Sequence, residues 1–99
     1  MASEYGKLLL NYCTDTDPKS VSKFLAQHNG LDILNARNNA GNTPLLMAAM
    51  CTREPLGRDC MTQLLNAGAT IDLVNKLGNS ALHTASKKGY ATIVDLLAR

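Results

Sequence analysis

The sequence predicts an all-α fold, a solenoid in which short helix-turn-helix units stack side by side with extended loops between them. Three observations support this prediction. A nine-residue segment recurs at an offset of 37 residues, each copy begins with residues that start helices, and each is followed by an aliphatic segment with helical spacing. With 99 residues, 45% hydrophobic but only 4% aromatic, the chain can form one domain whose core is aliphatic.

The repeat can be read directly from the letters. Gly41 to Ala49 reads GNTPLLMAA, and Gly78 to Ser86 reads GNSALHTAS. A second match follows each copy, LLNAGA in the first and VDLLA in the second. The first copy carries a few extra residues between its two landmarks, and without them the period would fall to about 33 residues. These motifs resemble those of the ankyrin-repeat family.

The resemblance is close over residues 30–99, and a degenerate earlier copy without the T-P-L-H signature precedes it. It implies an all-α ankyrin-repeat solenoid with extended connecting loops. We expect a single domain over residues 1–99, divided into repeats at about 3–38, 39–75 and 76–99. A terminal repeat that departs from the consensus is typical of such arrays, because its outer side has no neighbour.

Local signals place the helices. Thr43 is a good N-cap, and Pro44 at the first helical position loses only an N–H group that would be unpaired anyway. Pro55 and Gly57 predict a loop, not a helix, over residues 52–58, and Gly68 suits a left-handed helix end. Leu8, Leu9 and Leu10 predict the inner face of a first helix, and Val21, Phe24 and Leu25 that of a second. The expected helices are 3–12, 18–28, 43–51, 59–67, 80–88 and 91–98.

The cysteines and histidines do not form a catalytic or metal-binding pattern. Cys13, Cys51 and Cys60 contain no C-x-x-C pair, which predicts neither a disulfide framework nor a zinc site and favours a reducing, intracellular and cytoplasmic setting. We expect Cys60 and Cys13 in the core and Cys51 at the surface, as an ordinary or a reactive thiol. His83 occupies the family's T-P-L-H position, which implies a structural bond to Ser80. We expect His28 to be solvated.

Two polar segments have a functional and a structural interpretation. Asp15 and Asp17 are acidic residues of the kind that bind calcium, but the spread of oxygen ligands and the closing Glu of a calcium loop are missing, so helix capping is favoured. Lys87 and Lys88 before Gly89 could touch a phosphate, although this turn commonly carries lysines in the family. We therefore expect no metal, no cofactor, no small-molecule substrate and no enzyme activity.

Charge and hydropathy exclude two further classes of partner. Ten basic and eight acidic residues give a net charge of +2 without the concentrated basic stripe that nucleic acids require. No apolar run approaches the roughly 18 residues of a membrane span, and the first residues make a poor secretory signal. Nucleic acid and membrane are therefore not expected as partners.

The resemblance implies that the chain binds another protein through its loop tips and the exposed side of its first helices. Leu77 and Met50 would be apolar anchors there, and the lysines would favour an acidic rim on the partner. We expect an interaction module or scaffold segment of a larger intracellular protein; the alternative is a structural spacer with no partner of its own. The family positions expected to contact the partner are Arg37, Asn39, Ala40, Asn42, Met50, Cys51, Lys76, Leu77, Asn79, Lys87 and Lys88.

Two further expectations concern the extra residues and the end of the chain. Residues 52–59 would form a surface loop that is either a second contact site or a tolerated insertion. The chain stops inside its last expected helix, as a truncated repeat array would. An apolar flank should therefore be exposed, because each repeat buries its core only against a neighbour.

Overall fold

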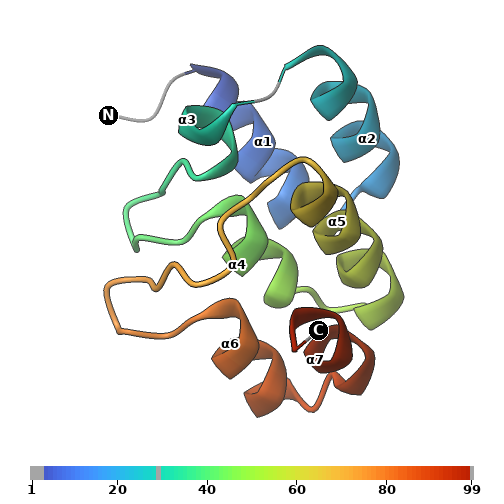
Figure 1. Ribbon diagram of the computed structural model, residues 1–99, viewed down its shortest axis with the longest axis vertical. Helices are drawn as coiled ribbons and strands as arrows, with labels where there is room; N and C mark the ends of the chain where they lie inside the picture. Colours follow the sequence, from blue (N-terminus) through green and yellow to red (C-terminus); the bar gives the residue numbers. More distant parts are fainter. Residues whose placement is uncertain (1–3, 29, 99) are drawn as a thin grey trace.

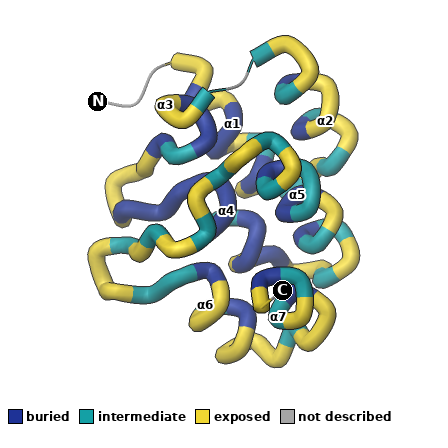
Figure 2. The backbone as a smooth tube through the Cα atoms, in the orientation of Figure 1, coloured by how far each residue is buried: buried dark blue, intermediate teal, exposed yellow. Residues whose placement is uncertain are grey.

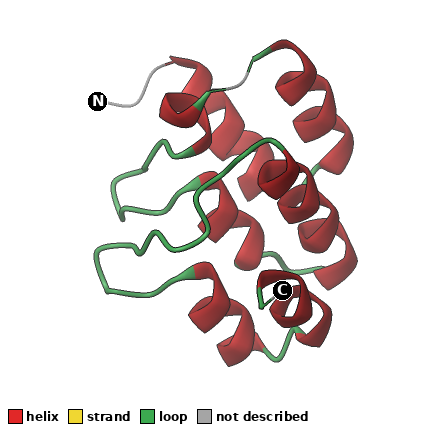
Figure 3. Ribbon diagram, in the orientation of Figure 1, coloured by secondary structure: helices red, strands yellow, loops and turns green. Residues whose placement is uncertain are grey.

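Three pairs of helices stack along the length of the computed structural model (Figure 1). The structure describes residues 4–28 and 30–98, and within these ranges it contains helices and loops but no strand (Figure 3). The all-α stack predicted from the sequence is therefore confirmed. The helices are α1 Glu4–Thr14, α2 Pro18–Gln27, α3 Leu31–Leu34, α4 Pro44–Ala49, α5 Glu54–Asn66, α6 Ala81–Lys88 and α7 Ala91–Leu97.

The pairs align in two rows. The first-helix row consists of α1, α4 and α6, and the second-helix row consists of α2, α5 and α7, with each helix in contact with its neighbour along the row. Two long loops, residues 35–43 and 67–80, project together from the side of the first-helix row (Figure 1). We call them the first and second finger loops.

The expected capping signals start and end the helices. The hydroxyl oxygen of Thr43 accepts a hydrogen bond of 3.3 Å from the amide of Leu46, and Ser80 caps α6 in the same way. Asp17, one of the two acidic residues before this helix, is the N-cap of α2, as the favoured interpretation predicted. Gly68, just beyond α5, has a φ of 103°, as predicted for a left-handed helix end.

The prediction of a loop over residues 52–59 is wrong from residue 54 onward. Helix α5 begins at Glu54, with Pro55 in its first turn, where the missing N–H group needs no acceptor. Gly57 lies inside this helix because it faces α4 at very close range: an added Cβ would lie 2.7 Å from the carbonyl oxygen of Ala48. The residues that lengthen this repeat therefore extend a helix.

Two other boundaries differ from the predictions. The short helix α3, with Ile33 and Leu34 buried, occupies a segment that was expected to be loop, and α4 ends at Ala49, two residues early. The predicted start of the first helix at residue 3 lies outside the described residues. Leu8 is 42% exposed and not part of the inner face, because the buried residues of α1, Leu9 and Cys13 among them, lie on another side of that helix.

The core runs through all three pairs without interruption. Helix α4 is the most enclosed element, since α1 and α6 cover it from two sides and α5 from a third (Figure 2). The expected aliphatic character is confirmed: the largest fully buried side chains are mostly Leu, Ile, Val and Met, with Phe24 as the one buried aromatic residue in the described ranges. The fully enclosed aliphatic residues are Leu9, Val21, Leu34, Leu45, Leu46, Met61, Leu64 and Ile93.

The expected exposed flank lies on α6. Leu45 of α4 is 2% exposed, whereas its counterpart in the repeat, Leu82 of α6, is 41% exposed. Similarly, Leu46 is buried and its counterpart His83 is exposed. These differences arise because α4 has a helix of the first row on each side and α6 has one only on the side of α4.

Candidate functional site

The two finger loops repeat the same hydrogen bonds. The side-chain oxygen of Asn38 accepts from the amides of Ala40 and Asn42 at 2.9 and 3.0 Å. That of Asn75 accepts from Leu77 and Asn79 at 3.0 and 3.1 Å. Such bonds fix an asparagine-based turn, so both tips are held in one conformation.

The loops are also tied to each other. The guanidinium Nη1 of Arg37 donates to the carbonyl oxygens of Val74 at 2.6 Å and Gly41 at 3.3 Å. The amide of Lys76 donates to the carbonyl oxygen of Ala40 at 3.0 Å. The predicted partner contacts Arg37, Ala40 and Lys76 are therefore brought together, and the two loops form one continuous edge.

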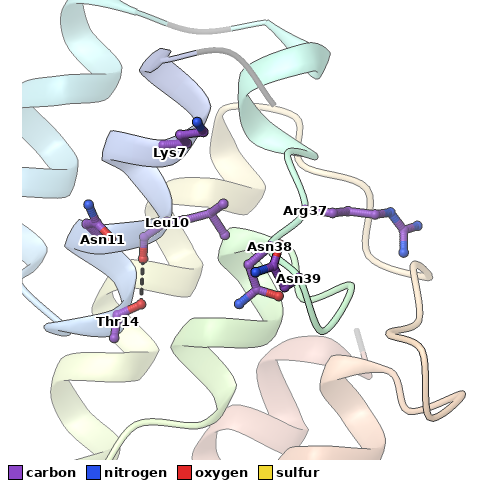
Figure 4. Close-up of a pocket in the computed structure, with 7 residues that line it drawn as sticks. All are labelled: Lys7, Leu10, Asn11, Thr14, Arg37, Asn38 and Asn39. Atoms are coloured by element: carbon purple, nitrogen blue, oxygen red, sulfur yellow. Dashed lines mark hydrogen bonds between the residues drawn. The ribbon is translucent and has the colours of Figure 1, made fainter. Parts of the chain in front are cut away.

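A hollow of about 580 Å³ opens between α1 and the first finger loop (Figure 4). Leu10 points from α1 toward the loop, while Arg37 points away from α1 toward the second finger loop. Thr14 closes one side, and its hydroxyl donates to the carbonyl oxygen of Leu10 at 2.8 Å. The lining residues are Lys7, Leu10, Asn11, Thr14, Arg37, Asn38 and Asn39.

The contribution of α1 was missed at the sequence level. Lys7, Leu10, Asn11 and Thr14 have the i, i+3, i+4 and i+7 spacing of one helix face. That spacing was the available signal, but α1 lacks the T-P-L-H motif by which the other repeats could be aligned. The hollow therefore extends the candidate surface onto the first repeat.

Several predicted contact residues are accessible on this surface. Leu77 is 84% exposed at the tip of the second finger loop, and Met50 is 42% exposed at the end of α4. Asn39 and Lys87 are exposed as well. Lys88 is exposed, and its ammonium nitrogen lies 5.8 Å from the centre of the Tyr90 ring.

Asn42 and Cys51 do not fit the role of partner contacts. Asn42 is 5% exposed because its side-chain oxygen accepts a 3.0 Å hydrogen bond from the side chain of Asn75 between the loops. Cys51 is 3% exposed and packs against Gly57, so the expectation of a surface thiol is wrong. Burial also raises the pKa of the Cys51 thiol, which disfavours the reactive thiolate form. Asn79 is half-buried.

The other two cysteines are buried, as predicted. Burial raises the pKa of Cys60 to about 12 and raises that of Cys13 further, with a contribution from Cys60 nearby. All three thiols are free and stay protonated at neutral pH. In the part of the chain that the structure describes, no three His, Cys, Asp or Glu side chains are grouped as a metal site would require.

The two histidines differ from their predictions. The backbone amide of His83 donates to the Ser80 hydroxyl oxygen at 3.2 Å, but the exposed imidazole makes no hydrogen bond with any described residue. The predicted bond to Ser80 therefore comes from the main chain. His28 is half-buried because its ring stacks on Tyr5 with 4.1 Å between ring centres.

Helices within residues 4–28 and 30–98 are all too short or too polar to cross a membrane.

Comparison with known proteins agrees with the fold. The family model of the ankyrin repeat matches residues 40–76. The chain is 38% identical over 68 residues to the rat (Rattus norvegicus) nuclear factor NF-kappa-B p105 subunit, covering 69% of this chain and 7% of that protein. It is 35% identical over 81 residues to human (Homo sapiens) neurogenic locus notch homolog protein 1, covering 82% of this chain and 3% of that protein. The chain spans less than a tenth of the length of these curated relatives.

Proposed function

Because the chain belongs to the ankyrin-repeat family, we propose that it binds another protein through its two finger loops and the accessible side of its first-helix row. The observation that carries this proposal is the exposure of Leu77. This leucine is 84% exposed at the tip of a loop whose backbone is fixed by Asn75 and linked to the first finger loop. A partner that covers Leu77 removes apolar surface from water at the centre of the site.

The rigidity of the loops favours binding. Ordering a flexible loop costs free energy on association, and a loop already held in its bound conformation avoids much of that cost. The bonds from Arg37 to Val74 and from Lys76 to Ala40 hold the two tips in register. Met50 adds a second accessible apolar side chain, and a few such anchors within a polar rim supply most of the binding energy in protein interfaces.

The remaining features support an interaction module over an enzyme. The three thiols are buried and protonated, which removes the strongest nucleophiles of the chain from catalysis. The relatives extend far beyond the matched segment, which supports a role as an interaction or scaffold segment of a larger protein. We place that protein in the cytoplasm because three free thiols suit a reducing compartment.

Cross-linking and capture from cells tests the proposal. The bait is the full chain, compared with the double variant Leu77→Asp and Met50→Asp, and the control is Leu82→Asp. Leu82 is a leucine of similar exposure to Met50, but it lies on the flank of α6. We expect proteins captured by the parent and by the control to be lost from the double variant, with circular dichroism unchanged.

Two results would contradict the proposal. Capture of the same proteins by parent and double variant would place the contact elsewhere on the chain. Capture of nothing by the parent would favour the alternative, a spacer that positions another domain and binds no partner itself.

A further inference from the structure

Basic side chains gather on the side of the molecule that carries the finger loops. Helices α1, α3, α4 and α6 and the two finger loops contain five basic residues and three acidic ones, Glu4, Asp32 and Asp72. The α2, α5 and α7 helices, with the turns that lead into them, contain five acidic residues and four basic ones within the described ranges. The five basic residues of the first group are Lys7, Arg37, Lys76, Lys87 and Lys88.

The sequence shows no concentrated basic stripe, whereas the fold places an excess of basic over acidic residues on this side. Five of the eight carboxylates lie in another part of the fold, on α2, α5 and α7 and the turns that lead into them. Glu54, for example, accepts hydrogen bonds from Thr92 in the second-helix row, and Asp17 caps α2. A partner that approaches the finger loops therefore meets a positive surface, where like-charged partners are rejected and acidic partners are attracted.

The hollow beside α1 provides unused hydrogen-bond donors within this positive surface. The side chains of Lys7, Asn11 and Asn39 line it, and none of them hydrogen-bonds to another described residue. Ammonium and amide groups are donors that suit carboxylate and peptide oxygens. Leu10 also lines this hollow but is only 7% exposed, so the accessible apolar contact of the surface is Leu77, which is 84% exposed.

We propose that the partner presents an extended acidic segment with an interspersed apolar side chain, and that this segment lies along the finger loops from the α1 hollow to α6. This proposal rests on the proposed function and specifies the chemistry of the partner. The molecule is 32 Å in its longest dimension, and an extended chain rises about 3.3 Å per residue, so roughly ten residues span the surface. Carboxylates of the segment pair with Lys7, Lys76 and Lys87, and its apolar side chain covers Leu77.

A nucleic acid fits the same surface less well. Backbone recognition needs closely spaced cations along the strand, whereas only single basic residues occur on α1 and on each finger loop. The described finger loops and first helices also contain neither Trp nor Phe as a stacking platform for bases, and Tyr5 and Tyr12 pack against Phe24. An acidic peptide needs only a few positive groups with an apolar contact between them.

NMR titration of the isotope-labelled chain with three probes tests the inference. The probes are a peptide of about ten residues of alternating Glu and Ser with one central Leu, the same peptide with Lys for Glu, and a single-stranded RNA of similar length. We expect the acidic peptide alone to shift the amide signals of Lys7, Asn39 and Leu77. Shifts caused equally by the lysine peptide, or by the RNA and not the acidic peptide, would overturn the inference.

Charge-reversed variants provide the matched comparison. Lys7→Glu combined with Lys87→Glu should lower the affinity for the acidic peptide by roughly five- to tenfold. Lys19→Glu combined with Lys23→Glu changes the net charge equally on α2 and should leave binding within about twofold. Equal weakening by the two pairs would show a response to net charge only and would refute the site.

The outcomes also separate this inference from the proposed function. If cellular proteins are captured through Leu77 and Met50 but the capture survives Lys7→Glu with Lys87→Glu, the module binds a protein of another chemistry and only the acidic segment is refuted. If capture fails with the parent chain, the proposed function itself is refuted.

Discussion

The side-chain amide of Asn75 donates a 3.0 Å hydrogen bond to the side-chain oxygen of Asn42, which is itself buried between the two finger loops. The oxygen of the same Asn75 side chain accepts the amides of Leu77 and Asn79 within its own loop. The side-chain oxygen of Asn75 therefore fixes the turn of the second finger loop, and its side-chain NH₂ group attaches that loop to the first finger loop.

Replacing Asn42 by Ala should destabilise the chain by about 1 kcal/mol, because the amide of the half-buried Asn75 loses its acceptor. Urea denaturation measures the change. The matched control is Asn79→Ala, which removes the equivalent side chain of the next repeat, where the side chain has no hydrogen-bond partner among the described residues. A loss as large for Asn79 as for Asn42 would contradict the assigned role of the bond.

Replacing Gly57 by Ala should destabilise the chain although Gly57 lies inside α5. In the exposed interior of a helix, replacing glycine by alanine stabilises the folded state by roughly 1 kcal/mol. At Gly57 the new Cβ would collide with the Sγ of Cys51 and would lie 2.7 Å from the carbonyl oxygen of Ala48, so α4 and α5 must separate. We expect a net loss of about 1–3 kcal/mol, as for other overpacked sites.

Thermal unfolding of Gly57→Ala, compared with Ser86→Ala, checks this sign. Ser86 is exposed in the middle of α6, where alanine should be neutral or slightly stabilising. A Gly57→Ala variant with an unchanged or raised Tm would show that the two helices do not approach as closely as the structure has them.

Replacing equivalent leucines of the two repeats by alanine should lower the free energy of unfolding by unequal amounts. Leu45→Ala removes a side chain that is 2% exposed and should cost about 2–5 kcal/mol. Leu82→Ala changes the counterpart, which is 41% exposed on the flank of α6, and should cost less than about 1 kcal/mol. Chemical denaturation of the two variants compares them directly. Comparable losses would indicate that the flank of Leu82 is covered in solution.

The sequence predicted the fold because its information is local and repeated. Thr43 and Ser80 indicate helix starts because their hydroxyl oxygens can accept a hydrogen bond from an amide of the first turn. Gly68 indicates a helix end because glycine adopts a positive φ without strain. Pro55 misled the prediction, since proline is compatible with both a loop and a first helical turn. Whether the following residues continue as a helix depends on packing against α4, which no local pattern encodes.

The candidate site was predictable only where side chains follow the repeat. The exposure of Leu77 and Met50 follows from their positions at a loop tip and a helix end. The burial of Cys51 depends on Gly57 six residues later, and the hollow beside α1 depends on how the degenerate first repeat packs. Both features depend on how closely neighbouring helices pack, which the local sequence does not determine.

Acid should remove one link between the second and third repeats. The carboxylate of Glu54 accepts hydrogen bonds from the hydroxyl of Thr92 at 2.6 Å and from its amide at 2.9 Å. These bonds, the hydroxyl bond foremost, lower the pKa of Glu54 in the folded chain. A carboxylate with a lowered folded-state pKa contributes stability that is complete above its unfolded pKa of about 4.3 and is lost as the pH falls through the folded value.

Glu54→Gln should therefore be less stable than the parent at pH 7, and the difference between the two free energies of unfolding should shrink as the pH falls below about 4. The introduced glutamine keeps the size of the side chain and does not titrate, so other acidic groups cancel in the comparison. In a Thr92→Val background the same difference should be smaller at pH 7, because only the amide bond remains. A difference that is constant with pH, or unaffected by Thr92→Val, would show that Glu54 does not act through Thr92, since the hydroxyl is the group that most favours its charged form.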